Sequence, residues 1–249
     1  MKYYRPETIE EALELLSEGV PLAGGTALAP ERRTLEAVVD LDRLGLDQIE
    51  IQSGTVRIGA ATRIQRLLDP DFELPAQLRR AARFEASLNL RNMATLGGTI
   101  MTANARSPLV LVLLALQTSV SISGEASEVP LDKLLDNRMT GETPFLIERI
   151  AFALPGALHY EYVARSPADR PLVSAAAVAP ADGKKYSIAI GGYGERPRLL
   201  DPVAGDAVEA ARQQAARRYS DAGDVFASAE YRSEVVSILV ERVLEEVQS

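Results

Sequence analysis

The chain has 249 residues, of which 47% are hydrophobic and 25% charged, and its formal net charge is −8. This balance is typical of a globular protein with a sizeable core and excludes disorder throughout. The acidic charge argues against nucleic acid as a general partner, because phosphate backbones repel it. The longest apolar run, Leu109–Leu116, is far shorter than the about 20 residues that a membrane-spanning helix needs. We therefore expect no membrane span.

Cysteine is absent, which excludes disulfides, a thiol nucleophile and iron–sulfur ligands from this sequence. His159 is the only histidine, so a multi-histidine metal site is excluded and a Ser–His–Asp triad would depend on this residue. No nucleophile motif accompanies His159, which favours a structural or surface role over a catalytic one. We predict no catalytic residue and no metal site. The amino terminus lacks the apolar core of a signal peptide, so a cytoplasmic location is expected.

The first part of the chain alternates short strands with helices. Thr8 and Glu11 have the spacing of a capping box, and apolar residues follow at helical spacing until Gly19. Pro108 is expected in the first turn of an apolar helix. The other expected elements are strands at 20–23 and 37–41, a hairpin at 49–58, helical segments at 62–68 and 75–88, a glycine-rich loop at 91–99, and strands at 119–123 and 145–153.

Leu154-Pro155-Gly156 interrupts the pattern and is the best candidate for a domain boundary. Three strand-like segments follow, at 160–163, 172–179 and 186–190, and Asp182-Gly183 predicts a hairpin turn between the last two. Two helices close the chain. Ser228 is the expected cap of the final helix, whose buried face is predicted to consist of Tyr231, Val235, Ile238, Leu239 and Val243.

Two glycine pairs follow buried segments and border threonine, at Gly24-Gly25 and Gly97-Gly98. Glycine has no Cβ, so its backbone N–H can approach an anion closely, and successive amides can form a nest that suits a pyrophosphate. Thr26, Thr95 or Thr99 would add hydroxyl donors. An ordinary turn is the alternative interpretation of each pair, since turns use glycine freely. Neither pair has the Rossmann or Walker spacing.

Several motifs, taken together and in this order, resemble the flavin-binding medium subunit of molybdenum hydroxylases. This is the family of carbon monoxide dehydrogenase medium subunits and xanthine dehydrogenase FAD domains. The similar segments are Tyr4–Ala12, Leu22–Thr26, Ile58–Thr62, Arg91–Gly98, Tyr160–Ser174, Gly191-Gly192, Pro197-Arg198 and Ser228–Arg232. The resemblance covers nearly the whole chain.

The resemblance implies an α+β fold with a vanillyl-alcohol-oxidase-like (PCMH-type) FAD-binding domain at 1–155. This domain would consist of two α/β subdomains at about 1–55 and 56–155. A C-terminal domain of the carbon monoxide dehydrogenase flavoprotein type would follow at 156–249, as a three-stranded antiparallel sheet with helices. By the same resemblance, two loops would cradle the pyrophosphate of non-covalent FAD through Ala23, Gly24, Gly25, Thr26, Ala27, Thr95, Leu96, Gly97, Gly98 and Thr99. Gly97→Val is expected to abolish flavin retention by filling the space for a phosphate.

The implied function is that of the FAD-binding electron-transfer subunit of a cytoplasmic molybdenum hydroxylase. Electrons would pass from iron–sulfur clusters of a partner to an external acceptor. The implied partners are a molybdopterin-containing large subunit and a 2Fe-2S small subunit, and the absence of cysteine agrees with clusters held elsewhere. A stand-alone flavin oxidoreductase is a further alternative.

Four positions depart from the family pattern. These are Ala27 for a polar residue, Thr99 for asparagine, Pro108 for an aspartate ahead of the apolar helix, and Tyr162 for a basic residue. Threonine retains a hydroxyl donor but lacks one bonding group of the amide, whereas proline at 108 is expected to lose an acceptor. These departures motivate the alternative of a flavin-free scaffold subunit in the same type of complex.

Overall fold

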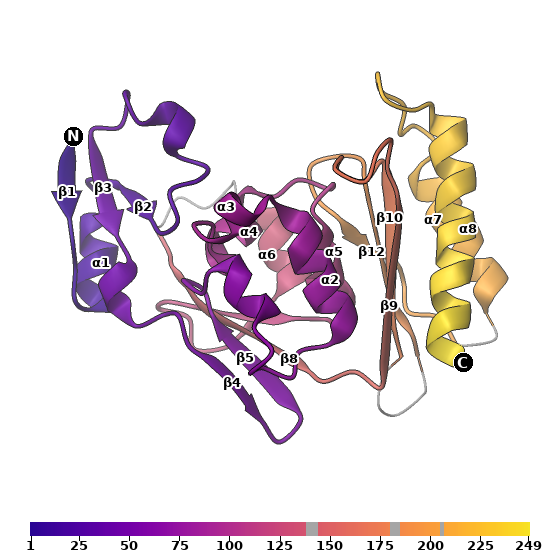
Figure 1. Cartoon of the computed structure of the whole chain (residues 1–249), viewed down its shortest axis with the longest axis horizontal. Helices are drawn as coiled ribbons and strands as arrows, with labels where there is room; N and C mark the ends of the chain where they lie inside the picture. Colours follow the sequence, from indigo (N-terminus) through magenta and orange to yellow (C-terminus); the bar gives the residue numbers. More distant parts are fainter. Residues whose placement is uncertain (138–143, 180–184, 205–206) are drawn as a thin grey trace. The chain divides into compact units, whose positions relative to one another are not determined.

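The computed structural model describes residues 1–137, 144–179, 185–204 and 207–249. The chain forms two compact units, which are coloured by sequence in Figure 1. Unit 1 consists of Met1–Glu73, Ala86–Thr102 and Thr118–Phe152, and unit 2 consists of Leu74–Glu85, Ala103–Gln117 and Ala153–Ser249. Both units thus combine separate stretches of chain. The predicted domains are contiguous ranges of the chain, with a boundary between residues 155 and 156 and two subdomains before it. That division stays a prediction.

Unit 1 begins with a parallel sheet of three short strands in the order β1-β3-β2. The strands are β1 (Lys2–Tyr4), β2 (Val20–Leu22) and β3 (Ala37–Asp40). Helix α1 (Ile9–Leu15) starts where the capping box predicts, because the Thr8 hydroxyl accepts a 3.2 Å hydrogen bond from Glu11 N. Its Ala12 is buried against Val39. Leu22 lies opposite Asp40, so the chain leaves β2 and β3 at the same edge of the sheet. This edge is where open parallel sheets place ligands.

The larger sheet of unit 1 has five strands in the order β4-β5-β8-β6-β7. They are β4 (Ile49–Gln52), β5 (Thr55–Gly59), β6 (Ser119–Ile122), β7 (Val129–Pro130) and β8 (Ile147–Ala153). The predicted β4–β5 hairpin is confirmed. Ser53 and Gly54 both have positive φ, 51° and 75°, as the two-residue turns that match strand twist require. Helix α6 (Leu131–Asn137) contacts β6 and β7.

Short helical turns complete unit 1. They are η1 (Ala29–Glu31), η2 (Asp42–Leu44), η3 (Ile64–Leu68), α3 (Leu88–Arg91) and α4 (Leu96–Thr102). The helical segment expected at 62–68 is thus a 3₁₀ helix, and the loop expected at 91–99 runs into helix α4. Helix α4 can begin there because the Thr95 hydroxyl accepts from Gly98 N over 3.2 Å, as an N-cap does. The helix therefore starts at the very glycines that suggested a loop.

Unit 2 contains an antiparallel sheet in the order β12-β11-β10-β9. The strands are β9 (Ala157–Val163), β10 (Val173–Ala179), β11 (Ser187–Gly191) and β12 (Arg198–Leu199). The expectation of three strands is wrong by one, because β12 is only two residues long and leaves no alternating pattern to detect. β10 pairs with β11 as predicted. The Asp182-Gly183 turn lies outside the described residues.

Helices cover this sheet on both sides (Figure 1). They are α2 (Ala76–Glu85), α5 (Pro108–Ala115), α7 (Val208–Arg218) and α8 (Ala229–Gln248). Helices α2 and α5 pack together, and α5 contacts β10 and β11, while α8 contacts α7, β9 and β10. Every residue of α5 is buried, which explains its uniformly apolar sequence. Among the described residues, no helix is long and apolar enough to cross a membrane.

The predicted buried face of α8 is partly wrong. Tyr231 and Ile238 are 42% and 38% exposed, whereas Val236 is fully buried. Ser228 caps the helix as predicted, through a 3.2 Å hydrogen bond from Tyr231 N. The actual buried stripe consists of Arg232, Val236, Leu239, Val240, Val243, Leu244 and Val247. The buried stripe includes Arg232, a charged residue that a search for apolar spacing passes over. The predicted face is therefore rotated relative to the observed one.

Candidate functional site

The two glycine segments meet inside unit 1. We call residues 23–27 the first loop and residues 95–99 the second loop. The first loop leaves β2, and its Gly24 lies directly against the backbone just before the second loop. A Cβ on Gly24 would overlap the carbonyl oxygen of Met93 and come within 2.9 Å of Ala94 Cα. Only glycine allows this approach. The spatial proximity that the resemblance implies for the two loops is therefore present.

The first loop presents free backbone donors. In the part of the chain that the structure describes, no protein acceptor lies within hydrogen-bonding distance of any backbone N–H of residues 23–27. All of these residues except Ala27 are half-buried. Gly25 has φ of +67°, the reversal that turns successive N–H groups toward one side. Half-buried amides without protein acceptors suit the oxygens of a diphosphate, so the first loop fits the pyrophosphate of FAD.

The second loop uses its amides within the protein instead. Leu96 N donates to Thr62 O over 2.9 Å, and Gly97 N donates to Ala60 O over 2.8 Å. Gly98 N bonds to the Thr95 hydroxyl, and Thr99 N bonds to Thr95 O over 2.9 Å. The amides of residues 96–99 are therefore bonded within the protein and are not available to a ligand.

Gly97 packs closely against Ala60. The prediction that a side chain at position 97 would fill the space for a phosphate is wrong. A Cβ at Gly97 would lie 2.9 Å from the Cβ of Ala60 and 3.1 Å from its carbonyl oxygen. The space beside Gly97 is therefore filled by the protein and is not open to a phosphate. Gly98 is the exposed member of the pair.

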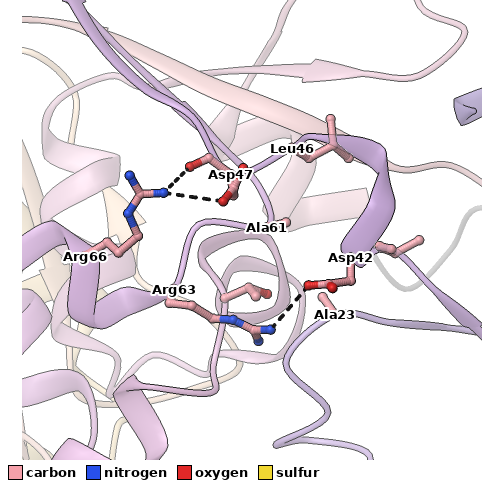
Figure 2. A pocket seen from close by; sticks show the side chains of 9 residues that line it. Ala23, Asp42, Leu46, Asp47, Ala61, Arg63 and Arg66 are labelled. Atoms are coloured by element: carbon pink, nitrogen blue, oxygen red, sulfur yellow. Dashed lines mark hydrogen bonds and ion pairs between the residues drawn. The ribbon is translucent and has the colours of Figure 1, made fainter. Parts of the chain in front are cut away.

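A pocket opens beside the loops and is lined by residues from both (Figure 2). Ala23 and Thr95 contribute from the loops, and the other lining residues are Leu41, Asp42, Leu46, Asp47, Ala61, Arg63 and Arg66. Arg66 is tied to Asp47, with 2.8 Å to its carbonyl oxygen and 3.4 Å to its carboxylate. Arg63 points toward Asp42, with Nη2 3.9 Å from Oδ1. Sequence reasoning missed these residues, although both arginines closely follow the Ile58–Thr62 motif.

Two of the four departures from the family pattern, Pro108 and Tyr162, lie in unit 2. At Pro108, the expected loss of an acceptor for the cofactor stays a prediction, and the start of the helix is instead bonded by the buried Glu85 carboxylate. Its Oε2 accepts from the Ser107 hydroxyl over 2.7 Å and from Leu109 N over 3.1 Å. Burial raises the pKa of Glu85, and the Ser107 hydrogen bond and the Arg170 charge oppose this shift only in part.

Tyr162, in place of a basic residue, lies in an aromatic cluster that has its own cation. Its ring stacks on Tyr160 at 5.6 Å and contacts Phe84 at the same centroid distance. The Arg80 guanidinium lies 5.9 Å from the centre of the Tyr162 ring. His159, also in β9, has its Nε2 3.7 Å from Glu161 and its Nδ1 4.0 Å from Glu246. His159 thus lies between two glutamates of unit 2, Glu161 and Glu246.

The match to a family model decides the identity. Residues 1–152 match the family described as the FAD binding domain in molybdopterin dehydrogenase. The chain belongs to this family. The predicted family is therefore confirmed, and FAD is the cofactor that it indicates. The residues of the first loop fit that cofactor, as described above.

Similar proteins agree with this family. The chain is 37% identical over 147 residues to the uncharacterized protein YgfM of Escherichia coli K12, a match covering 54% of this chain and 56% of that protein. It is 31% identical to the 6-hydroxypseudooxynicotine dehydrogenase complex subunit alpha of Paenarthrobacter nicotinovorans, over 97% of this chain and 92% of that one. The fold matches a chain of the carbon monoxide dehydrogenase from Hydrogenophaga pseudoflava with a TM-score of 0.83 and 23% identity, over 100% of this chain and 97% of that chain.

These comparisons agree with the assignment of the chain to the family of FAD binding domains in molybdopterin dehydrogenase. The match to YgfM spans only about half the length of each protein, while the dehydrogenase subunit matches nearly end to end. The structural likeness, at this identity, supports the mixed α and β fold alone.

Proposed function

We propose that this chain is the electron-transfer flavoprotein subunit of a molybdenum hydroxylase, with a molybdopterin-containing large subunit and a 2Fe-2S small subunit as partners. Bound FAD would supply the redox chemistry between the iron–sulfur clusters and an external acceptor. The backbone N–H groups of residues 23–27 carry the proposal, because among the described residues they have no protein acceptor and so could bond to a diphosphate. A cytoplasmic location stays a prediction.

The chain's own residues would bind and orient the cofactor. The first loop would donate backbone hydrogen bonds to the pyrophosphate, with the Thr26 hydroxyl as a further donor. The backbone of Met93, just before the second loop, would hold the first loop in place through its contact with Gly24. Because these 249 residues contain no cysteine, cluster ligands must come from a partner.

Flavin content tests the proposal directly. The full chain is purified alone and together with the products of neighbouring genes, denatured, and assayed for released flavin by chromatography. We expect near-stoichiometric FAD. Gly24→Ala should lose it, because the new methyl group collides with the Met93 carbonyl. Gly223→Ala is the matched control, since a Cβ there meets Ala229 N at an ordinary 3.5 Å.

The flavin-free scaffold is the second candidate. The observation that favours it is the second loop, where the amides of residues 96–99 are already bonded within the protein. A scaffold would contain no FAD in either preparation, even after reconstitution with excess FAD. Near-stoichiometric FAD would exclude it.

A further inference from the structure

We infer that Arg63 is the positioning residue that holds the first loop in its diphosphate-binding conformation. This inference rests on the proposed function and adds a residue that neither glycine motif contains. Few hydrogen bonds hold the first loop. Among the described residues, its one backbone hydrogen bond to the rest of the chain runs from Ala29 N to Gly25 O over 3.0 Å. Its shape therefore depends on the surface against which Gly24 lies.

That surface is the Met93 carbonyl, and Arg63 fixes it. Arg63 Nη1 donates a hydrogen bond to Met93 O, the same atom that a Cβ on Gly24 would overlap. The neighbouring backbone reinforces the contact, since Ile64 N donates to Ala94 O over 3.0 Å. A hydrogen bond from a charged donor is stronger than one between neutral groups. The guanidinium therefore sets the position of the oxygen that supports the first loop.

Arg63 also reaches the segment that follows β3. Its Nη2 lies 3.9 Å from Asp42 Oδ1, and Arg5 Nη2 approaches the same carboxylate at 3.8 Å. Asp42 thus connects Arg63 to the carboxyl edge of the parallel sheet, where β2 delivers the first loop. One side chain thus joins the Met93 backbone, just before the second loop, to this edge. Arginine reaches the two partners through different guanidinium nitrogens, a fork that the single ammonium of lysine lacks.

Arg66 provides a matched comparison. It lines the same pocket, and its side chain is 40% exposed against 36% for Arg63. Its guanidinium bonds to Asp47 and contacts neither loop (Figure 2). Removing either arginine changes the formal charge of the pocket equally, but only Arg63 bonds to the carbonyl against which Gly24 lies.

The experiment compares Arg63→Met with Arg66→Met in the full chain. Binding of FAD, ADP and riboflavin is titrated, and hydrogen–deuterium exchange of a peptide spanning residues 20–30 is measured without ligand. We expect Arg63→Met to weaken FAD and ADP about tenfold or more and to speed exchange. Riboflavin, which has no diphosphate, should change little. Arg66→Met should leave the exchange of residues 20–30 at the wild-type rate and should weaken FAD and ADP less than Arg63→Met does. Arg63→Lys should recover part of the loss through the Met93 contact.

Equal FAD affinity and equal exchange in the two methionine variants would overturn the inference. A fall in thermal midpoint common to both variants, with no difference in exchange, would overturn it too. If the wild-type chain binds neither FAD nor ADP, the proposed function fails. The exchange rates then decide alone whether Arg63 holds the first loop.

Discussion

Glu85 and Ser107 form a buried hydrogen bond of 2.7 Å that joins the end of α2 to the start of α5. Glu85 is only 5% exposed, and Arg170 approaches its other oxygen at 3.6 Å. The same carboxylate accepts from Leu109 N, so it takes part in capping α5. Two helices of unit 2 are thus held together by one titratable group.

This pair predicts a pH-dependent stability. Burial raises the pKa of Glu85 in the folded protein, so folding favours its protonated form. Its contribution to stability is fully present below the ordinary glutamate pKa and declines as pH rises through the folded pKa. Glu85→Gln should therefore gain stability relative to the wild type as pH increases, because the amide retains an acceptor without charge. Urea unfolding of both proteins at several pH values measures this difference.

The control is Glu85→Ala, which removes the acceptor altogether. We expect it to be destabilised at every pH, by about 1–3 kcal/mol for the unpaired buried donors. A Glu85→Gln difference that stays constant with pH would contradict the assignment of the titration to this group.

The Gly97–Ala60 contact predicts a compensating pair of substitutions. Gly97→Ala should cost about 1–3 kcal/mol, as overpacking does, because its methyl group would lie 2.9 Å from the Ala60 Cβ. Ala60→Gly removes that methyl group and should restore part of the stability lost in Gly97→Ala. A double-mutant cycle in thermal or urea unfolding measures the coupling. Strictly additive effects would show that the two residues do not constrain each other.

The Asp224–Arg232 pair predicts a local stability effect in unit 2. Arg232 is 1% exposed and donates to both carboxylate oxygens of Asp224, at 2.7 and 2.8 Å, as well as to the Leu172 carbonyl. Asp224→Asn should cost about 3 kcal/mol, since it leaves a buried charge without its partner. Asp221→Asn, an exposed position in the same loop, serves as the control and should change unfolding little.

Partial burial alone would raise the pKa of Asp224, but hydrogen bonds from Phe226 N and Arg232 lower it overall. Stability from this group is present above the ordinary aspartate pKa and is lost as pH falls through the folded pKa. The cost of Asp224→Asn should accordingly shrink in acid. An unchanged cost near pH 3 would contradict this.

Helix α8 predicts a contrast between two of its residues. Val236→Ala should destabilise unit 2 by about 1–2 kcal/mol, because it removes two methyl groups from a fully buried site. Tyr231→Ala should cost less, since Tyr231 is 42% exposed. Equal losses in chemical denaturation would mean that Tyr231 makes contacts beyond those its exposure indicates.

Local rules predicted much of the backbone. Ser53-Gly54 identified a hairpin because the turn requires positive φ at both residues, and Thr8 and Ser228 identified helix starts through their own hydroxyl groups. These features depend on residues close together in sequence. The failures involve distant partners. Arg232 is buried because Asp224 and the Leu172 carbonyl meet it, and hydropathy contains no trace of that arrangement.

The candidate site was predictable only in part. The glycine pairs marked both loops, but their different uses depend on which amides find acceptors elsewhere in the chain. Leu96 and Gly97 find theirs at Thr62 and Ala60, while the first loop finds none among the described residues. Glu85 was invisible as the acceptor for Ser107, because 22 positions separate them along the chain.

The close approach of Gly24 to Met93 has a consequence for tracing cofactor loss among relatives of this chain. Selection for a stable fold alone would preserve Gly24, because any side chain there displaces the backbone that it touches. Gly97 is under the same constraint from Ala60. A lineage that had abandoned the flavin would therefore still contain Gly24 and Gly97. The positions released to drift would be those whose side chains serve only the ligand, such as Thr26.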